Sequence, residues 1–222
     1  MANKSKYPKP EIIQTRVEYV TQSTWHIVSS IAYIAMREAI NHEMRTDEEI
    51  AYMTGWSDRR RPTYYDSMGD PNSQVGSTLR AHQQYWNTRL TMAVKDGTPV
   101  GYAYSADNAS GSWPIRQLKH RDPLQKKNYL WIRGVAVVPE EQGRGIGRLL
   151  LQPHLEHASK KQPLTSYTLK DELPDSETWW QQIGLEPTGT QEVYPFGPDT
   201  RPSTEVRMQA SSVKSVLHML KR

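Results

Sequence analysis

Apolar and polar residues alternate with the period of a β-strand in several short stretches of the chain. These stretches are 11–21, 90–94, 100–104, 129–138, 164–169, 188–194 and 204–208. Two of them flank Asp96-Gly97, the dipeptide that tight strand turns prefer, so they are predicted to form a β-hairpin.

Apolar residues recur at helical spacing in the intervening segments, which predicts helices there. The predicted helices are 25–44, 47–53, 77–86, 146–159, 175–183 and 213–220. Pro153 falls inside 146–159 and removes one backbone hydrogen bond, so we expect that helix to kink or shorten. Strands alternating with helices in this order predict an α/β fold, with helices packed on the faces of one sheet.

The length of 222 residues suits a single hydrophobic core better than two. We expect a disordered N-terminal segment over 1–10, a single domain over 11–210 and a C-terminal tail with a helical stretch over 211–222. A polar stretch, 107–128, is predicted to be an insert, because it carries several lysines and arginines and no clear apolar period.

Composition excludes several classes of protein. The chain has no cysteine, which rules out disulfides, zinc–cysteine sites and a thiol nucleophile. It has neither a signal peptide at its start nor the roughly 18 consecutive apolar residues of a membrane span, so we expect a cytoplasmic protein without membrane contact. A net charge of +4 needs no more than exposed lysines, although an anionic ligand or nucleic acid would also suit it.

The most informative motif is a glycine-rich turn between a predicted strand and a predicted helix. Val135-Ala136-Val137-Val138-Pro139 is followed by Gln142-Gly143-Arg144-Gly145-Ile146-Gly147-Arg148. Backbone amides at the start of a helix have no partner within it, and the helix dipole adds positive character there. Glycines let an oxygen-rich ligand approach, and two arginines add charge, so the motif predicts a phosphate site.

Two other phosphate-binding motifs fit poorly. The nucleoside-triphosphate loop requires Gly-Lys-Ser/Thr at its end, where this chain has Gly147-Arg148-Leu149. The dinucleotide fingerprint requires an early strand–helix–strand unit, whereas this loop follows several strands.

The chain resembles the Gcn5-related N-acetyltransferase (GNAT) superfamily. Residues 142–147 look like the Gln/Arg-x-x-Gly-x-Gly/Ala signature of that family, and Trp180-Gln181-Gln182-Ile183-Gly184-Leu185 looks like its weaker aromatic-x-x-x-Gly-Phe signature. The resemblance implies a single mixed, mostly antiparallel sheet of about six or seven strands flanked by helices. It also implies transfer of an acetyl group from acetyl-CoA, the acyl donor, to an amine, without a metal.

The resemblance assigns cofactor roles to two groups of residues. Backbone groups of Val135, Ala136 and Val137 would hold the pantetheine arm. The diphosphate would be wrapped by Gln142, Gly143, Arg144, Gly145, Ile146, Gly147 and Arg148.

The chain departs from the family pattern where proton transfer is usual. In many family members a glutamate in this strand acts as the general base, and here that position is Trp131, with Arg133 nearby. The tyrosine that usually acts as the general acid is replaced by Trp180. Three interpretations remain open. Base and acid come from elsewhere, such as an N-terminal glutamate with Tyr167 or Tyr194; positioning of a neutral amine suffices; or the chain binds acyl-CoA without catalysis. The catalytic residues are therefore unknown.

The acceptor is not identified by the sequence. A small molecule or a peptide amine is favoured. Acidic residues over 38–49 would attract a cationic amine, while Arg59-Arg60-Arg61 and the basic insert would suit aminoacyl-tRNA, which we favour less. His154 and His157 are interpreted as surface residues rather than metal ligands. The oligomeric state is unknown, and a dimer is compatible with the sequence.

Overall fold

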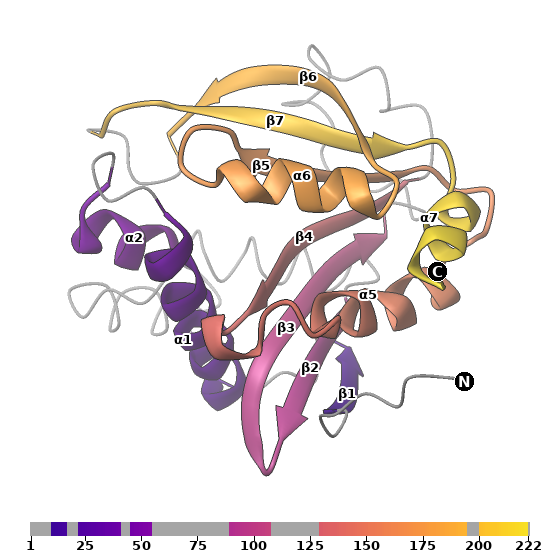
Figure 1. Ribbon diagram of the computed structural model, residues 1–222, viewed down its shortest axis with the longest axis horizontal. Coiled ribbons are helices and arrows are strands. Elements are labelled where there is room, and N and C mark those ends of the chain that lie inside the picture. The colour runs from indigo at the N-terminus through magenta and orange to yellow at the C-terminus, as the bar shows by residue number, and fades with distance from the viewer. Residues whose placement is uncertain are drawn as a thin grey trace, which may run out of the picture.

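The computed structural model describes residues 10–16, 22–40, 45–54, 89–107, 129–194 and 200–221. Within these residues, seven strands form one sheet in the order β1-β2-β3-β4-β5-β7-β6 (Figure 1). The strands are β1 (Glu11–Arg16), β2 (Arg89–Lys95), β3 (Thr98–Asp107), β4 (Leu130–Val137), β5 (Leu164–Leu169), β6 (Glu186–Val193) and β7 (Ser203–Ala210). Only β4 and β5 pair in parallel, which confirms the mixed, mostly antiparallel sheet.

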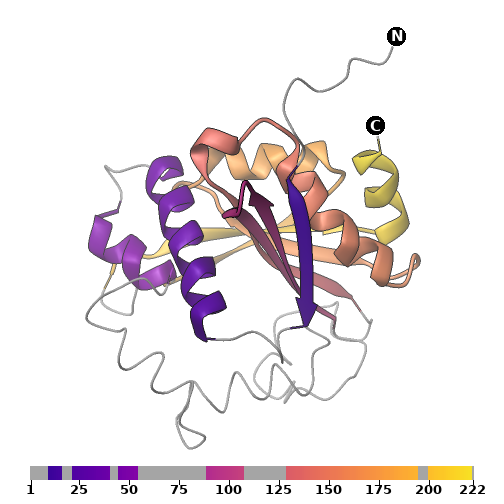
Figure 2. The same cartoon turned by 90° about the horizontal axis from the view of Figure 1, so that it is seen from below.

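Helices cover both faces of the sheet (Figure 2). One face carries α1 (Gln22–Ala39) and α2 (Asp47–Thr54), and the other carries α5 (Ile146–His157), α6 (Pro174–Gln182) and α7 (Val213–Leu220). A short 3-10 helix, η4 (Pro139–Glu141), connects β4 to the glycine-rich turn. None of the helices in the described ranges has both the length and the apolar character needed to cross a bilayer.

Four predicted features fall outside the described residues. They are the N-terminal segment before Pro10, the arginine-rich stretch at 59–61, the helix at 77–86 and the basic insert beyond Asp107.

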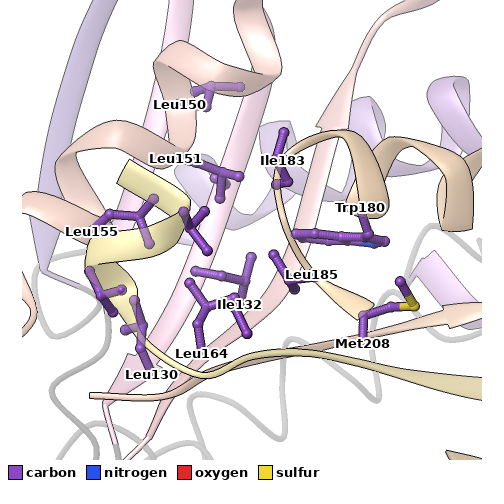
Figure 3. Packing of buried hydrophobic residues seen from close by; sticks show 14 of the residues in the cluster. Leu130, Ile132, Leu150, Leu151, Leu155, Leu164, Trp180, Ile183, Leu185 and Met208 are labelled. Carbon is purple, nitrogen blue, oxygen red and sulfur yellow. The ribbon is translucent and has the colours of Figure 1, made fainter. Parts of the chain in front are cut away.

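The main core lies between the sheet and the helices α5, α6 and α7 (Figure 3). Leu150, Leu151 and Leu155 of α5 pack there with Ile132 of β4 and Met208 of β7. The five are at most 1% exposed. Val213 and Val216 of α7 are buried in the same cluster, so the C-terminal helix belongs to the packed core.

Gly101 of β3 allows α5 to approach the sheet closely. A Cβ atom at this position would lie 2.9 Å from the Ala136 carbonyl oxygen and 3.1 Å from Cδ1 of Leu150. Both neighbours belong to the elements that carry the glycine-rich turn, so the absence of a side chain at Gly101 helps to set where α5 begins.

The helix α5 continues through Pro153 and ends at His157, two residues earlier than predicted. The interpretation of His154 as a surface residue is wrong: its side chain is 1% exposed. Positions 150, 151, 154, 155 and 158 form one helical stripe, and all of them are buried. The sequence therefore contained the signal for a buried histidine.

His154 is held in its neutral form by its surroundings. Nε2 lies 2.9 Å from Oγ1 of Thr91, and Nδ1 lies 2.6 Å from Oγ of Ser105. The Thr91 hydroxyl donates to the Leu150 carbonyl at 2.8 Å, so Nε2 carries the proton and Nδ1 accepts from Ser105. Burial, reinforced by the charge of Arg89, lowers the pKa of His154 to about 3. This histidine connects α5 to β2 and β3 as a structural group.

The α1 face is anchored by a buried ion pair. Both side chains of Arg45 and Glu172 are 0% exposed, and Nη2 of Arg45 lies 2.9 Å from Oε1 of Glu172. The same nitrogen donates to the hydroxyl of Ser203 at 2.8 Å. The pair joins the start of α2 to the segment after β5 and to the start of β7.

The helix α1 ends at Ala39, earlier than the predicted Met44, and α2 then begins at Asp47. Thr46 and Glu49 form a capping box, in which the Thr46 amide donates to Glu49 at 2.8 Å and the Glu49 amide to the Thr46 hydroxyl at 3.3 Å. The packing of Ile40 against Ile50 and Leu169 fixes the path between the helices. These long-range contacts are absent from the periodicity of the sequence.

Candidate functional site

The strands β4 and β5 separate shortly after they begin. They pair only at Leu130–Leu164 and Trp131–Thr165, and the hydroxyl of Ser166 then donates to the Ile132 carbonyl at 2.9 Å. Beyond that point the two strands diverge, as Figure 1 shows. We call the region between residues 132–137 and 166–169 the β4–β5 separation.

Alternation along β4 decides which backbone groups face this separation. The Val138 amide donates to the Val100 carbonyl of β3, so Ala136 and Tyr102 form the next hydrogen-bonded pair. The backbone groups of Val135 and Val137 consequently face away from β3, toward the β4–β5 separation. Of the three residues predicted to hold pantetheine, two present backbone groups there, and Ala136 is turned to β3.

The glycine-rich turn lies at the end of β4, before α5. Gly143 and Gly145 have φ angles of 71° and 79°, in the left-handed region that favours glycine. A Cβ atom at either position would meet nothing within 4 Å, and residues 142–145 are exposed. Gly145 is the N-cap residue of α5, and no side chain accepts a hydrogen bond from the first amides of the helix. These amides can therefore donate to an external anion.

Gly147 has a packing role in addition to the one that its place in the motif predicts. A Cβ atom there would lie 3.0 Å from Cζ2 of Trp179 on α6. The space left by the missing side chain is therefore occupied by an indole ring, and Gly147 allows α5 and α6 to pack. Ile146, the first helical residue, is buried, while Arg148 is half-buried.

Side chains hold the turn in place from both ends. The amide of Gln142 donates to the Val137 carbonyl at 2.9 Å. Glu141 accepts from Lys95 of β2 at 2.5 Å and from Arg144 at 2.8 Å. The hydrogen bond from Lys95, aided by the charge of Arg144, lowers the pKa of Glu141. Arg144 is therefore paired within the turn. The second arginine of the motif, Arg148, lies in the first turn of α5.

The positions that usually carry proton transfer hold no carboxylate and no tyrosine. Trp131 is half-buried and meets Tyr167 of β5 edge to face, with ring centroids 5.6 Å apart. Trp180 is 4% exposed and packs with Ile183 and Leu185 in the core (Figure 3). Of the two tyrosines considered as acids, Tyr167 thus lies at the β4–β5 separation.

Tyr194 follows the end of β6, where its side chain is 49% exposed. Its hydroxyl donates to Glu192 at 3.1 Å, and that hydrogen bond raises the pKa of Tyr194. Among the acidic residues of the N-terminal helices, Glu49 is committed to the capping box and to Arg45. Within the described residues, these contacts do not bring Tyr194 or Glu49 to the β4–β5 separation.

Sequence reasoning missed the surroundings of Arg133. This residue sits at a β-bulge in β4, because Ile132 and Gly134 oppose consecutive residues of β3. Its guanidinium carbon lies 4.5 Å from the Trp131 ring centroid and 5.9 Å from that of Tyr104. The bulge was not visible in the sequence, since the alternation of β4 looks continuous.

A parallel strand pair that opens beside an exposed helix start offers backbone groups to an extended ligand with an anionic end. The family model described as Acetyltransferase (GNAT) family matches residues 39–177, well over half of the chain. The chain belongs to this family, and it is an N-acetyltransferase enzyme. No curated protein matches the sequence.

Solved structures share the fold at low sequence identity. One described as an acetyltransferase of the GNAT family from Desulfovibrio desulfuricans has a TM-score of 0.51 and 13% identity, covering 91% of this chain and 99% of its own. A Pyrococcus horikoshii OT3 protein has a TM-score of 0.52 and 13% identity, with the same coverage. A third, described as histone acetyltransferase HPA2 and related acetyltransferase from Corynebacterium glutamicum ATCC 13032, has a TM-score of 0.50 and 13% identity, covering 90% and 96%.

Proposed function

We propose that this enzyme transfers the acetyl group of acetyl-CoA to the amine of an acceptor, with the cofactor diphosphate held by the turn Gln142–Gly147 and by Arg148. The observation that carries the proposal is the uncapped start of α5, next to two open glycines of positive φ. An anion there accepts the hydrogen bonds that the helix cannot satisfy, and the helix dipole favours its charge.

The pantetheine arm would follow the edge of β4. Val135 and Val137 point their backbone groups toward the β4–β5 separation, which is the direction that an extended arm from the turn would take. The assignment of Ala136 becomes a contact through its side chain only, because its backbone pairs with Tyr102.

The reaction needs a neutral amine beside the thioester. Its nitrogen attacks the carbonyl carbon, the carbon–sulfur bond breaks, the thiolate takes up a proton and the new amide loses one. A backbone amide of β4 near Val135 would stabilise charge on the carbonyl oxygen. Tyr167 is the candidate donor of a proton to sulfur, because it lies beside Trp131 where the strands part.

Calorimetric titration with acetyl-CoA tests the cofactor site. Wild-type protein should bind, and Gly145→Glu should bind at least about 100-fold more weakly, because it places bulk and negative charge at the diphosphate. Gly189→Glu on the exposed strand β6 is the matched control, since a Cβ there meets nothing within 4 Å. Retained affinity in Gly145→Glu would place the diphosphate elsewhere.

Release of coenzyme A thiol in the presence of amines tests the transfer. Turnover with any amine supports an enzyme, whereas tight binding of acetyl-CoA without thiol release across amines, peptides and aminoacyl-tRNA would support an acyl-CoA sensor instead. The titration therefore tests the cofactor site, the thiol assay tests the transfer reaction, and either result can be negative without the other.

A further inference from the structure

A cluster of aromatic rings and guanidinium groups lies on the α1 face, where β4 and β5 part. Trp131 and Tyr167 form its centre, with Arg133 against Trp131 at 4.5 Å and Arg207 of β7 at 5.9 Å from the Tyr167 ring. Tyr167 and Arg207 are direct cross-strand partners. One arginine thus stands at each end of an aromatic pair.

The register of the sheet places this cluster opposite the cofactor turn. Tyr104 and Leu90 are cross-strand partners on the face that packs against Val28 of α1. Leu169, two residues after Tyr167 and on the same face of β5, packs against Ile40 and Ile50. The cluster therefore lies on the face of α1 and α2, while the glycine-rich turn leads into α5 on the other face.

The chemistry of the cluster suits an anion better than a cation. Arg133 is exposed, and its guanidinium packs against the Trp131 ring and hydrogen-bonds to Tyr104. A guanidinium carries five N–H donors in a planar fork that matches a carboxylate or a phosphate, so an anion can share the group with these neighbours. Burial raises the pKa of Tyr104, and the charge of Arg133 opposes that rise. The family position that often carries a glutamate, which would attract a cationic amine, holds Trp131 here, with the positive charge of Arg133 against its ring.

We propose that the acceptor is a small amine that also carries an anionic group, and that this group binds Arg133 beside Trp131 at the β4–β5 separation. The inference rests on the proposed acetyl transfer and names the class of its acceptor. The anion would anchor the acceptor on the α1 face and direct its amine toward the thioester. Arg133 is then a specificity-determining residue.

Matched pairs of amines test this proposal. One arm uses free L-amino acids against their carboxamides, and the other uses phosphoethanolamine against ethanolamine. Each pair is titrated into protein saturated with coenzyme A, and its kcat and KM for thiol release from acetyl-CoA are measured. The wild-type enzyme should favour the anionic member of at least one arm about tenfold or more, and the arm with the larger ratio identifies carboxylate or phosphate.

Substitutions of Arg133 separate anion recognition from a structural role. Arg133→Gln should raise KM and Kd for the anionic member about tenfold and leave the neutral member and acetyl-CoA binding unchanged. Arg133→Lys should keep part of the preference, because it retains charge without the planar fork. Arg37→Gln removes the same charge from an exposed site on α1 and should change nothing.

Three results would overturn the proposal. They are equal affinity for both members of both pairs, an equal loss for both members in Arg133→Gln, and weaker binding of acetyl-CoA in that variant. Affinity for the amines is measured on the protein in complex with coenzyme A, so it does not depend on turnover. A lack of turnover with every amine would count against the transfer reaction, and the affinities would still test the acceptor class.

Discussion

On the α5 side, the β4–β5 separation is bordered by backbone groups, glycines and apolar side chains. On the α1 side, it is bordered by aromatic rings and guanidinium groups, and a buried ion pair anchors that face of the sheet. The first side matches the acetyltransferase motif, and the second departs from it at Trp131 and Arg133. Under the proposals made above, cofactor binding depends on backbone geometry, whereas acceptor choice depends on side chains. Each side can then be disturbed without the other.

The largest effect is expected from Glu172→Ala on the α1 side. The substitution leaves Arg45 buried without its main partner, which should lower the free energy of unfolding by about 3–5 kcal/mol. Denaturant unfolding measures this, with Glu186→Ala on exposed β6 as a control of little effect. The folded fraction should still bind acetyl-CoA normally; a parallel loss of binding would contradict the independence of the two sides.

A smaller effect is expected from Gly101→Ala on the α5 side. The new methyl group would press on the Ala136 carbonyl at 2.9 Å, and on Leu150. Such overpacking should lower the free energy of unfolding by about 1–3 kcal/mol. It should also weaken acetyl-CoA binding, because α5 and β4 carry the turn. Gly189→Ala, in open space, is the control, and equal behaviour of the two variants would refute the close packing described for Gly101.

The last effect, which is absent at neutral pH, is a pH dependence caused by His154. Burial lowers its pKa to about 3, so the unfolded chain takes up the proton first as the pH falls below about 6.5. The stabilisation is therefore complete above pH 6.5 and is lost toward pH 3, by at most about 1.4 kcal/mol per pH unit. Unfolding free energies across this range should show a shallower slope in His154→Gln; an unchanged slope would assign the effect to carboxylates.

Local patterns carried most of what the sequence could predict. The hairpin at Asp96-Gly97, the seven strands and the glycine-rich turn all follow from short-range periodicity and turn chemistry. The burial of His154 was also local, since the residue falls in the stripe of Leu150 and Leu151, and it was missed only because a polar residue was assumed to be exposed.

Contacts between distant residues could not be predicted in this way. Arg45 meets Glu172 across 127 positions of the chain, and no local pattern marks either residue as buried. No local pattern indicates that Gly147 also makes room for Trp179 of α6. Arg133 was recognised as a departure from the family, but its packing on Trp131 required the bulge in β4.

The central claim is that unpaired amides at the start of α5 hold a diphosphate, and comparison of coenzyme A with pantetheine tests it most directly. The two share the thiol arm, and only coenzyme A carries the phosphates. Calorimetric titration of the wild-type protein should show coenzyme A binding at least about 100-fold more tightly, and Gly145→Glu should remove most of that difference. Equal affinity of the wild-type protein for the two compounds would contradict the account.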